Sequence, residues 1–458
     1  MSDSQPPPQQ PNPSPSSTPG PAEPAALLLC GARLTDGRTV DVRLGGGRIE
    51  AVGTAGSLAG DPVVPGPAHP ANAFLPSPAC AATTDAGGGG GGGAGPGTGT
   101  GAAPARVNLE GYLLLPAPVE PHAHADTALT AEADGPAPGD PQDVQRRATE
   151  AVLAQLGHGS TAIRSHVRVG DVQGLGALEA VLRVRGVVRD LVDLAVVAMP
   201  RLLTGAAGAD GLALLRDAVG MGATVVGGCP DRDPDPTGYV EAVLDLASAH
   251  GCAVDLHTDG TDPARLCRLA AMAGGLRGGV TLGPLGGLGL LPSDVASRCA
   301  DQLAAAGVGV VCLPQGGCAG ADRRGAAPVR LLRAAGVRVA AGSGSLRDLS
   351  NPVGRGDPLE AAYLLASQDA LPVEDAFGTV SAAARAVLGL PPVRVEAGFP
   401  ADLLAVRGDR LAGALSLAYS RLVIHAGRVV SRTSAVREYC DLGGAGAGPE
   451  LPRQARHP

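Results

Sequence analysis

The chain has 458 residues, of which 44% are hydrophobic, so it is long enough to bury a large core. A formal net charge of −8 provides no basic stripe, and an aromatic content of 2% without tryptophan provides no base-stacking surface. These features exclude nucleic acid as an expected partner and favour a small molecule. The nine cysteines form no CxxC pair, so we expect reduced thiols rather than a disulfide framework or a zinc ribbon.

The first 25 residues are rich in Pro, Ser and Gln and predict a disordered tail. They have no cationic start followed by an apolar stretch. No later segment has roughly 18 uninterrupted apolar residues, the length that a membrane-spanning helix needs. We therefore expect a cytoplasmic protein without a membrane partner.

Short apolar strands over residues 26–53 are separated by glycine turns and predict an antiparallel meander. The same strand, turn, strand rhythm returns over residues 391–432, so the two chain ends are predicted to form one small β-sandwich domain. Between the first of these pieces and the next ordered segment, residues 54–106 are rich in Gly and Pro and predict a flexible insert. Residues 433–458 are expected to form a C-terminal tail.

Residues 107–390 alternate between apolar strand-like runs and helical segments such as 140–159 and 292–307, where apolar residues recur every three or four positions. This alternation predicts the α/β class and a (β/α)8 TIM-like barrel, whose active site would lie at the C-terminal ends of its strands. The eight predicted strands lie near residues 113–119, 161–166, 194–198, 223–227, 252–257, 279–283, 308–313 and 337–341.

The segment "EPHAHADTALT" follows the first apolar run and carries His122 and His124. Residues i and i+2 of a strand point to the same face, so both imidazoles can bind one metal ion. His257, in "AVDLHTDG", follows the fifth run and could supply a third ligand. The alternative is that the pair arose by chance in a chain with nine histidines and merely ends a strand.

Several segments, in this order, resemble the amidohydrolase superfamily and in detail its cytosine deaminase-like branch. They are "LPAPVEPHAHADTALT", "RSHVRVGD", "GATVVGGCPD", "VDLHTDGTDP", "GSGSLRDLSNPVGRGDP" and "GFPADLLAV", and the resemblance covers roughly residues 26–53 and 107–432. It implies a metal-dependent hydrolase acting on a non-peptide C–N bond of a small cyclic or amide compound. The implied cofactor is a divalent metal, zinc or iron, with His122, His124 and His257 as ligands.

The chain departs from the family pattern at three positions of the expected site. Gly283-Pro284 stands where the family has a sixth-strand His, which completes the metal set. Gly260 stands in place of a Glu that shuttles a proton, and Gly344 in place of an Asp that binds the metal and acts as base. Loss of the metal and of catalysis therefore stays open, and the alternative function is a non-catalytic pseudoenzyme barrel used for ligand or protein binding.

The remaining candidates follow other strand ends. Asp259 and Asp348 are the candidate catalytic carboxylates, with a helix cap or a solvated loop carboxylate as the alternative for each. His166 and Arg201 are the candidate substrate-binding residues. A homo-oligomer is an assembly that barrels of this class often form, but no segment identifies an interface.

Overall fold

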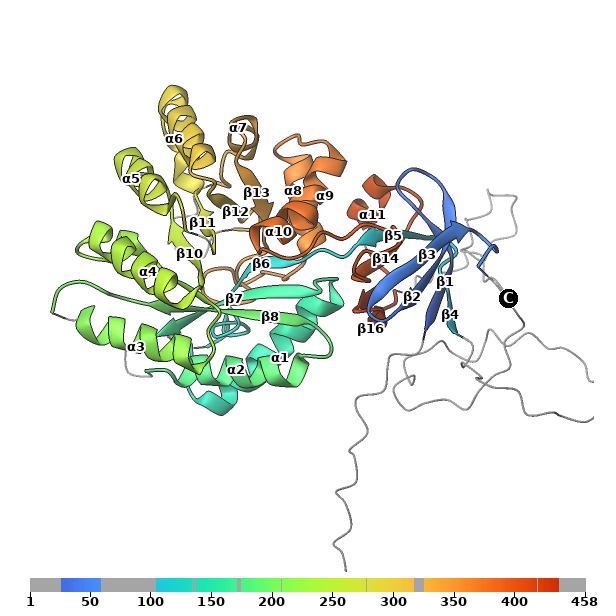
Figure 1. The fold of residues 1–458 in the computed structure, drawn as a ribbon, viewed down its shortest axis with the longest axis horizontal. Coiled ribbons are helices and arrows are strands. Elements are labelled where there is room, and N and C mark those ends of the chain that lie inside the picture. Colours follow the sequence, from blue (N-terminus) through green and yellow to red (C-terminus); the bar gives the residue numbers. More distant parts are fainter. Residues whose placement is uncertain are drawn as a thin grey trace, which may run out of the picture.

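The computed structural model describes residues 26–58, 104–133, 135, 137–170, 174–206, 208–276, 278–316, 325–417 and 419–435. The predicted tail 1–25, residues 59–103 of the predicted insert and residues 436–458 lie outside the described residues. Two eight-stranded sheets organise the chain, and Figure 1 shows them side by side.

The larger unit is a parallel sheet wound into a barrel, with its strands in the order in which they occur in the chain. Its ends meet at a bridge between Ala123 and Gly344, where the Gly344 amide donates to the His122 carbonyl at 3.1 Å. The predicted (β/α)8 fold is thus confirmed. The strands are β6 (Glu120–Ala123), β7 (Ala162–Val169), β8 (Asp193–Pro200), β9 (Val225–Gly228), β10 (Ala253–Thr258), β11 (Val280–Pro284), β12 (Gly309–Cys312) and β13 (Arg338–Ala341).

Helices cover the outside of the barrel, and one dipeptide marks several of their starts. Asp-Pro begins α1, α4, α5 and α8, where the Asp side chain accepts a backbone N–H of the first turn and Pro occupies the first helical position. The helices are α1 (Pro141–Gly157), α2 (Gly176–Val188), α3 (Gly208–Met221), α4 (Pro236–His250), α5 (Pro263–Ala273), α6 (Ser293–Ala305), α7 (Val329–Ala334), α8 (Pro358–Ser367), α9 (Val373–Val380), α10 (Ala382–Val387) and α11 (Leu411–Leu417), with short 3₁₀ turns η4 (Pro230–Arg232) and η5 (Gly286–Leu290).

The sequence predicts residues 113–119 as the first barrel strand, and this prediction is wrong. Residues of this run form β5 (Tyr112–Pro116), which pairs with β14 (Leu403–Arg407) outside the barrel. The apolar run is broken by Pro116 and Pro118, which remove ladder donors, so the barrel strand β6 starts only at Glu120. The other seven predicted strands each overlap a barrel strand.

The second sheet joins the two chain ends, as predicted. Strand β5 pairs antiparallel with β14, and Leu114 lies opposite Ala405. Buried side chains from both ends, including Leu29, Val42 and Ile424, form a separate apolar cluster. Besides β5 and β14, this sheet contains β1 (Leu27–Arg33), β2 (Thr39–Gly45), β3 (Arg48–Thr54), β4 (Ala105–Asn108), β15 (Arg421–His425) and β16 (Arg428–Thr433).

None of the helices in the described ranges combines the length and the apolar character that crossing a membrane requires.

Candidate metal centre

Four histidines converge inside the barrel at the C-terminal ends of three strands. His122 lies in β6, His124 directly after it, His166 in β7 and His257 in β10. One ring nitrogen of each lies within 4.8 Å of the corresponding nitrogens of the other three. His124 is partly exposed, whereas the other three side chains are buried. We call these four residues the imidazole cluster.

The contact between His124 and His257 has the spacing that a shared metal ion would impose. Their Nε2 atoms lie 3.4 Å apart. Two imidazole nitrogens at about 2.0–2.1 Å from a tetrahedral zinc ion are separated by about 3.3–3.4 Å. The two rings are therefore already oriented with their donor atoms toward a common point.

The imidazole cluster is electrostatically suited to a cation. Burial, followed by the neighbouring His166, lowers the pKa of His124 to about 4. Burial, followed by the neighbouring His166, also holds the pKa values of His122 and His257 well below their ordinary range. A neutral imidazole is the form that binds a metal ion, so these rings need lose no proton near neutral pH.

His166 differs from the other three because both of its ring nitrogens face oxygen atoms. Its Nδ1 lies 3.3 Å from the Ala123 carbonyl oxygen, and its Nε2 lies 3.3 Å from Oδ1 of Asp255. The buried Arg164 donates to the other oxygen of Asp255 at 3.0 Å. Burial by itself would raise the pKa of Asp255, but His166 and Arg164 hold it below its ordinary value.

Sequence reasoning missed Arg164 and Asp255, although the strand period contained a signal for both. Arg164 and His166 are two residues apart in β7, and Asp255 and His257 are two residues apart in β10. Each pair therefore points to one face of its strand. A charged residue in an otherwise apolar barrel strand, two positions from a histidine, indicates a second polar layer beneath the imidazole cluster.

Glu120 is a further buried carboxylate that the sequence analysis did not single out. It accepts hydrogen bonds from the backbone N–H of His122 and of Ser343, each at 3.0 Å, and from the Ser343 hydroxyl. Burial raises its pKa to about 7. Glu120 thereby ties β6 to the turn after β13 and fixes the backbone that carries His122.

Asp348 lies near the imidazole cluster, but both of its oxygens are used by the surrounding loops. Oδ2 accepts from the Thr127 hydroxyl at 2.8 Å, and Oδ1 accepts from the backbone N–H of Ser350 and Asn351 at 2.8 and 3.1 Å. These contacts join the loop after β6 to the loop after β13. They favour the structural alternative for Asp348 over a catalytic one.

Two other aspartates lie at the same end of the barrel. Asp126 is buried and accepts from Arg168 through Oδ2, while its Oδ1 has no hydrogen-bond partner among the described residues. Asp259 is half-buried in the turn after β10, where its carbonyl oxygen accepts from the Gly287 amide at 2.8 Å. Arg201 is exposed directly after β8. The candidate residues thus share one rim of the barrel.

Two glycines, at positions where the resemblance leads us to expect an acid, lie in backbone conformations and surroundings that disfavour a side chain. Gly260 has a φ of +69°, and a Cβ there would lie 3.0 Å from Cδ2 of Leu285. Gly344 has a φ of +72°, and its Cβ would lie 3.3 Å from the Gly316 carbonyl oxygen. The left-handed region disfavours other residues, so neither position would accept the family's acid without a local change.

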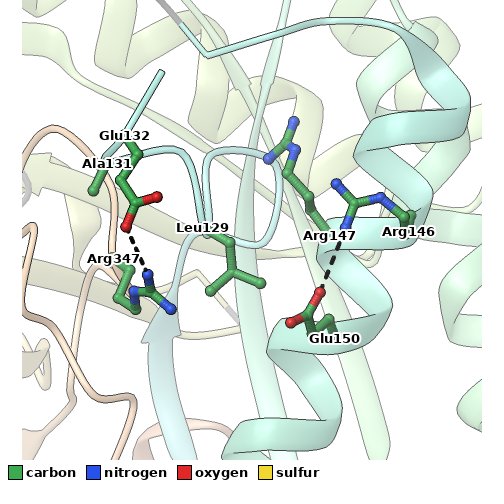
Figure 2. Close-up of a pocket in the computed structure, with 7 residues that line it drawn as sticks. All are labelled: Leu129, Ala131, Glu132, Arg146, Arg147, Glu150 and Arg347. Atoms are coloured by element: carbon green, nitrogen blue, oxygen red, sulfur yellow. Dashed lines mark hydrogen bonds and ion pairs between the residues drawn. The ribbon is translucent and has the colours of Figure 1, made fainter. Parts of the chain in front are cut away.

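A cavity of about 200 Å³ lies between the loop after β6, helix α1 and the loop after β13. Figure 2 shows Glu132 paired with Arg347 on one side and Arg146 paired with Glu150 on the other, at 3.1 and 3.5 Å. None of the four histidines lines it. This cavity is therefore not built from the residues of the metal centre.

Comparison with known proteins agrees with this geometry. The sequence profile described as "Amidohydrolase family" matches residues 151–431, more than half of the chain. The chain belongs to the amidohydrolase family. The resemblance drawn from the strand-end motifs, including its deaminase-like branch, is therefore confirmed.

Among proteins similar to this amidohydrolase is a pterin deaminase of Rhizobium rhizogenes (strain K84 / ATCC BAA-868), 30% identical over 64% of this chain and 70% of that protein. N-isopropylammelide isopropylaminohydrolase from Burkholderia multivorans ATCC 17616 has a solved structure with a TM-score of 0.69 and 25% identity, covering 89% of this chain and 99% of that one. The 5-methylcytosine deaminase of Klebsiella pneumoniae, liganded with 5-fluorocytosine, has a TM-score of 0.69 and 24% identity, covering 90% and 99%. The last likeness concerns the fold alone.

Proposed function

We propose that this amidohydrolase is a metal-dependent hydrolase that acts on a non-peptide C–N bond of a small cyclic or amide compound. The observation that carries the proposal is the 3.4 Å separation between the Nε2 atoms of His124 and His257 inside the imidazole cluster. A single N–H···N hydrogen bond between two neutral rings would also give this separation, but the convergence of four ring nitrogens within 4.8 Å of one another favours a shared ion.

The residues present fit a divalent ion such as zinc or iron. His122, His124 and His257 would hold it, because their neutral rings supply three nitrogen donors and leave a fourth position open. When bound, such an ion supplies Lewis-acid chemistry, which makes water a usable nucleophile at neutral pH. His166 is left out of the ligand set because its Nε2 faces the carboxylate of Asp255.

The other groups would bind and orient the substrate. His166 lies beside the three proposed ligands, with its Nδ1 3.3 Å from the Ala123 carbonyl oxygen, and would contact a substrate that binds at the ion. Arg201 lies at the same rim and would contact a polar substituent. Asp259 would be the catalytic carboxylate, because it lies two residues after His257 in the turn that follows β10. Asp348 accepts three hydrogen bonds from its own and the neighbouring loop.

The relatives support a small nitrogen-containing substrate. One is named as a deaminase of pterin and another as an aminohydrolase of N-isopropylammelide. Both names describe loss of an amine or ammonia from a small molecule. We therefore place the substrate of this chain in the same broad class.

A second candidate is supported by the glycines at the replaced positions. Gly260 and Gly344 adopt positive φ values, and nearby atoms crowd the space that a longer side chain would need. If no other group replaces the missing acids, the barrel would bind a ligand or a protein without hydrolysing it. This pseudoenzyme would not require the imidazole cluster to hold metal.

The deciding experiment is elemental analysis of the purified full chain at pH 7.5, followed by measurement of ammonia or amine release from a panel of pterins, pyrimidines and triazines. Bound zinc or iron near one equivalent together with release from one of these substrates supports the hydrolase. Absence of zinc, iron and manganese after metal supplementation would reject it. Stoichiometric metal without turnover of any compound would favour the non-catalytic barrel.

A further inference from the structure

A pair of thiols joins two neighbouring barrel helices away from the imidazole cluster. Cys267 lies in α5 and Cys299 in α6, and their Sγ atoms are 3.5 Å apart. Helices α5 and α6 pack against each other on the outside of the barrel. Among the six cysteines in the described ranges, this is the one pair with its sulfur atoms in contact.

The two thiols differ in their access to solvent. Cys299 is 1% exposed, whereas Cys267 is half-buried. Burial, followed by the contact with Cys267, raises the pKa of the Cys299 thiol to about 11. A thiolate is the attacking form in disulfide exchange, so the more accessible Cys267 is the group that meets a reagent first.

We propose that Cys267 and Cys299 form a reversible intramolecular disulfide by exchange with a small-molecule disulfide. The Cys267 thiolate attacks one sulfur of that reagent, forms a mixed disulfide and releases one thiolate. The Cys299 thiolate then attacks the Cys267 sulfur, closes the protein disulfide and releases the second thiolate. The two protons of the cysteines pass to the released thiolates, so the protein is oxidised and the reagent is reduced to two thiols.

The resulting bond would connect two units of the barrel beside the candidate site. Helix α5 begins six residues after His257, and α6 follows η5. The Gly287 amide of η5 donates to the Asp259 carbonyl at 2.8 Å, and the Leu285 amide donates to the Thr258 carbonyl at 3.0 Å. The turn that carries Asp259 lies between β10 and α5 and accepts hydrogen bonds from the segment that precedes α6. A disulfide between α5 and α6 would therefore restrain this turn from both sides.

The test uses the full chain incubated with oxidised glutathione, followed by intact-mass measurement and peptide mapping without reductant. We expect loss of the mass of two hydrogen atoms, a linked peptide pair containing Cys267 and Cys299, and full reversal by dithiothreitol. The oxidised chain should melt roughly 5 °C higher, because the crosslink restricts the unfolded chain.

Two variants separate the steps. Cys299→Ser should stop at the mixed disulfide and retain one glutathione on residue 267, whereas Cys30→Ser, remote in the other sheet, should crosslink like the wild type. Glutathione retained on Cys267 of the wild type would overturn the proposal. So would an unreacted pair, or disulfides that instead involve Cys80, Cys318 or Cys440. The wild-type peptide map decides the matter even if a variant fails to fold.

Discussion

The Nε2 atoms of His124 and His257 lie 3.4 Å apart, although the two residues are separated by 133 positions in the chain. Two nitrogens on one tetrahedral ion require this separation. If the ion binds the native state alone, it stabilises the fold by about 2.7 kcal/mol at a free concentration of 100 times the dissociation constant. That linkage gives a direct test of the metal assignment.

We expect His124→Ala to lose bound metal and to become insensitive to chelator. Wild-type protein in metal-replete buffer should unfold at a higher urea concentration than in chelator, whereas the variant should show little difference. His250→Ala is the control, because His250 is exposed at the end of α4. Equal chelator responses of the wild type and His124→Ala would contradict the assignment and favour a barrel without metal.

The buried pair of Arg164 and Asp255 should contribute strongly to stability when one partner is removed. We expect Asp255→Asn to lower the free energy of unfolding by about 3–5 kcal/mol, because the buried guanidinium loses its counter-charge. Urea denaturation measures the effect. Asp294→Asn, which breaks an exposed pair with Arg298, should leave the midpoint nearly unchanged. Similar small effects of both substitutions would show that Asp255 does not hold Arg164.

Glu120 should make the fold less stable as pH rises. Burial raises its pKa from 4.5 to about 7, so the native carboxyl keeps a proton that the unfolded chain has lost. This contribution is complete below pH 4.5 and is lost as pH rises to about 7, for a total of about 3 kcal/mol. We expect Glu120→Gln to remove this part of the pH dependence of the free energy of unfolding. Urea unfolding in chelator between pH 4.5 and 8 measures it.

The histidines have the opposite effect and provide the internal control for that measurement. His124 has a pKa lowered from 6.5 to about 4, so its stabilising contribution is present above pH 6.5 and is lost as pH falls toward 4. The Glu120→Gln variant should still lose this histidine contribution to stability as pH falls from 6.5 toward 4. If the difference between the wild type and the variant does not depend on pH, the carboxyl of Glu120 does not titrate in this range.

Restoring the family's acid at Gly344 should cost stability. We expect Gly344→Asp to lower the free energy of unfolding by about 1–2 kcal/mol, because φ is +72° and a Cβ would approach the Gly316 carbonyl at 3.3 Å. Gly37→Asp is the matched control, since Gly37 also has a positive φ but lies in open space. The difference between the losses of unfolding free energy in the two variants measures the cost of the crowding at position 344. An equally stable variant that gains metal would contradict this account.

Much of this protein follows from the sequence by itself. The alternation of strand-like and helix-like segments predicts the barrel. The spacing of apolar residues within each segment shows both its type and the face that it buries. The pairing of the chain ends and the position of His122 and His124 at a strand end were predictable for the same reason. The error over residues 113–119 arose because an apolar run does not show which sheet will receive it.

The tertiary structure decided what the sequence could not. Glu120 accepts hydrogen bonds from Ser343 and Asp255 pairs with Arg164, in each case a residue far away in the chain. Local sequence patterns do not show which distant residues will become partners. By sequence, Asp348 is as good a candidate for a catalytic group as Asp259, but in the folded chain it accepts hydrogen bonds from Thr127 and from the amide of Ser350. Burial and pairing set the chemistry of these carboxylates, and both depend on distances between segments that only the folded chain brings together.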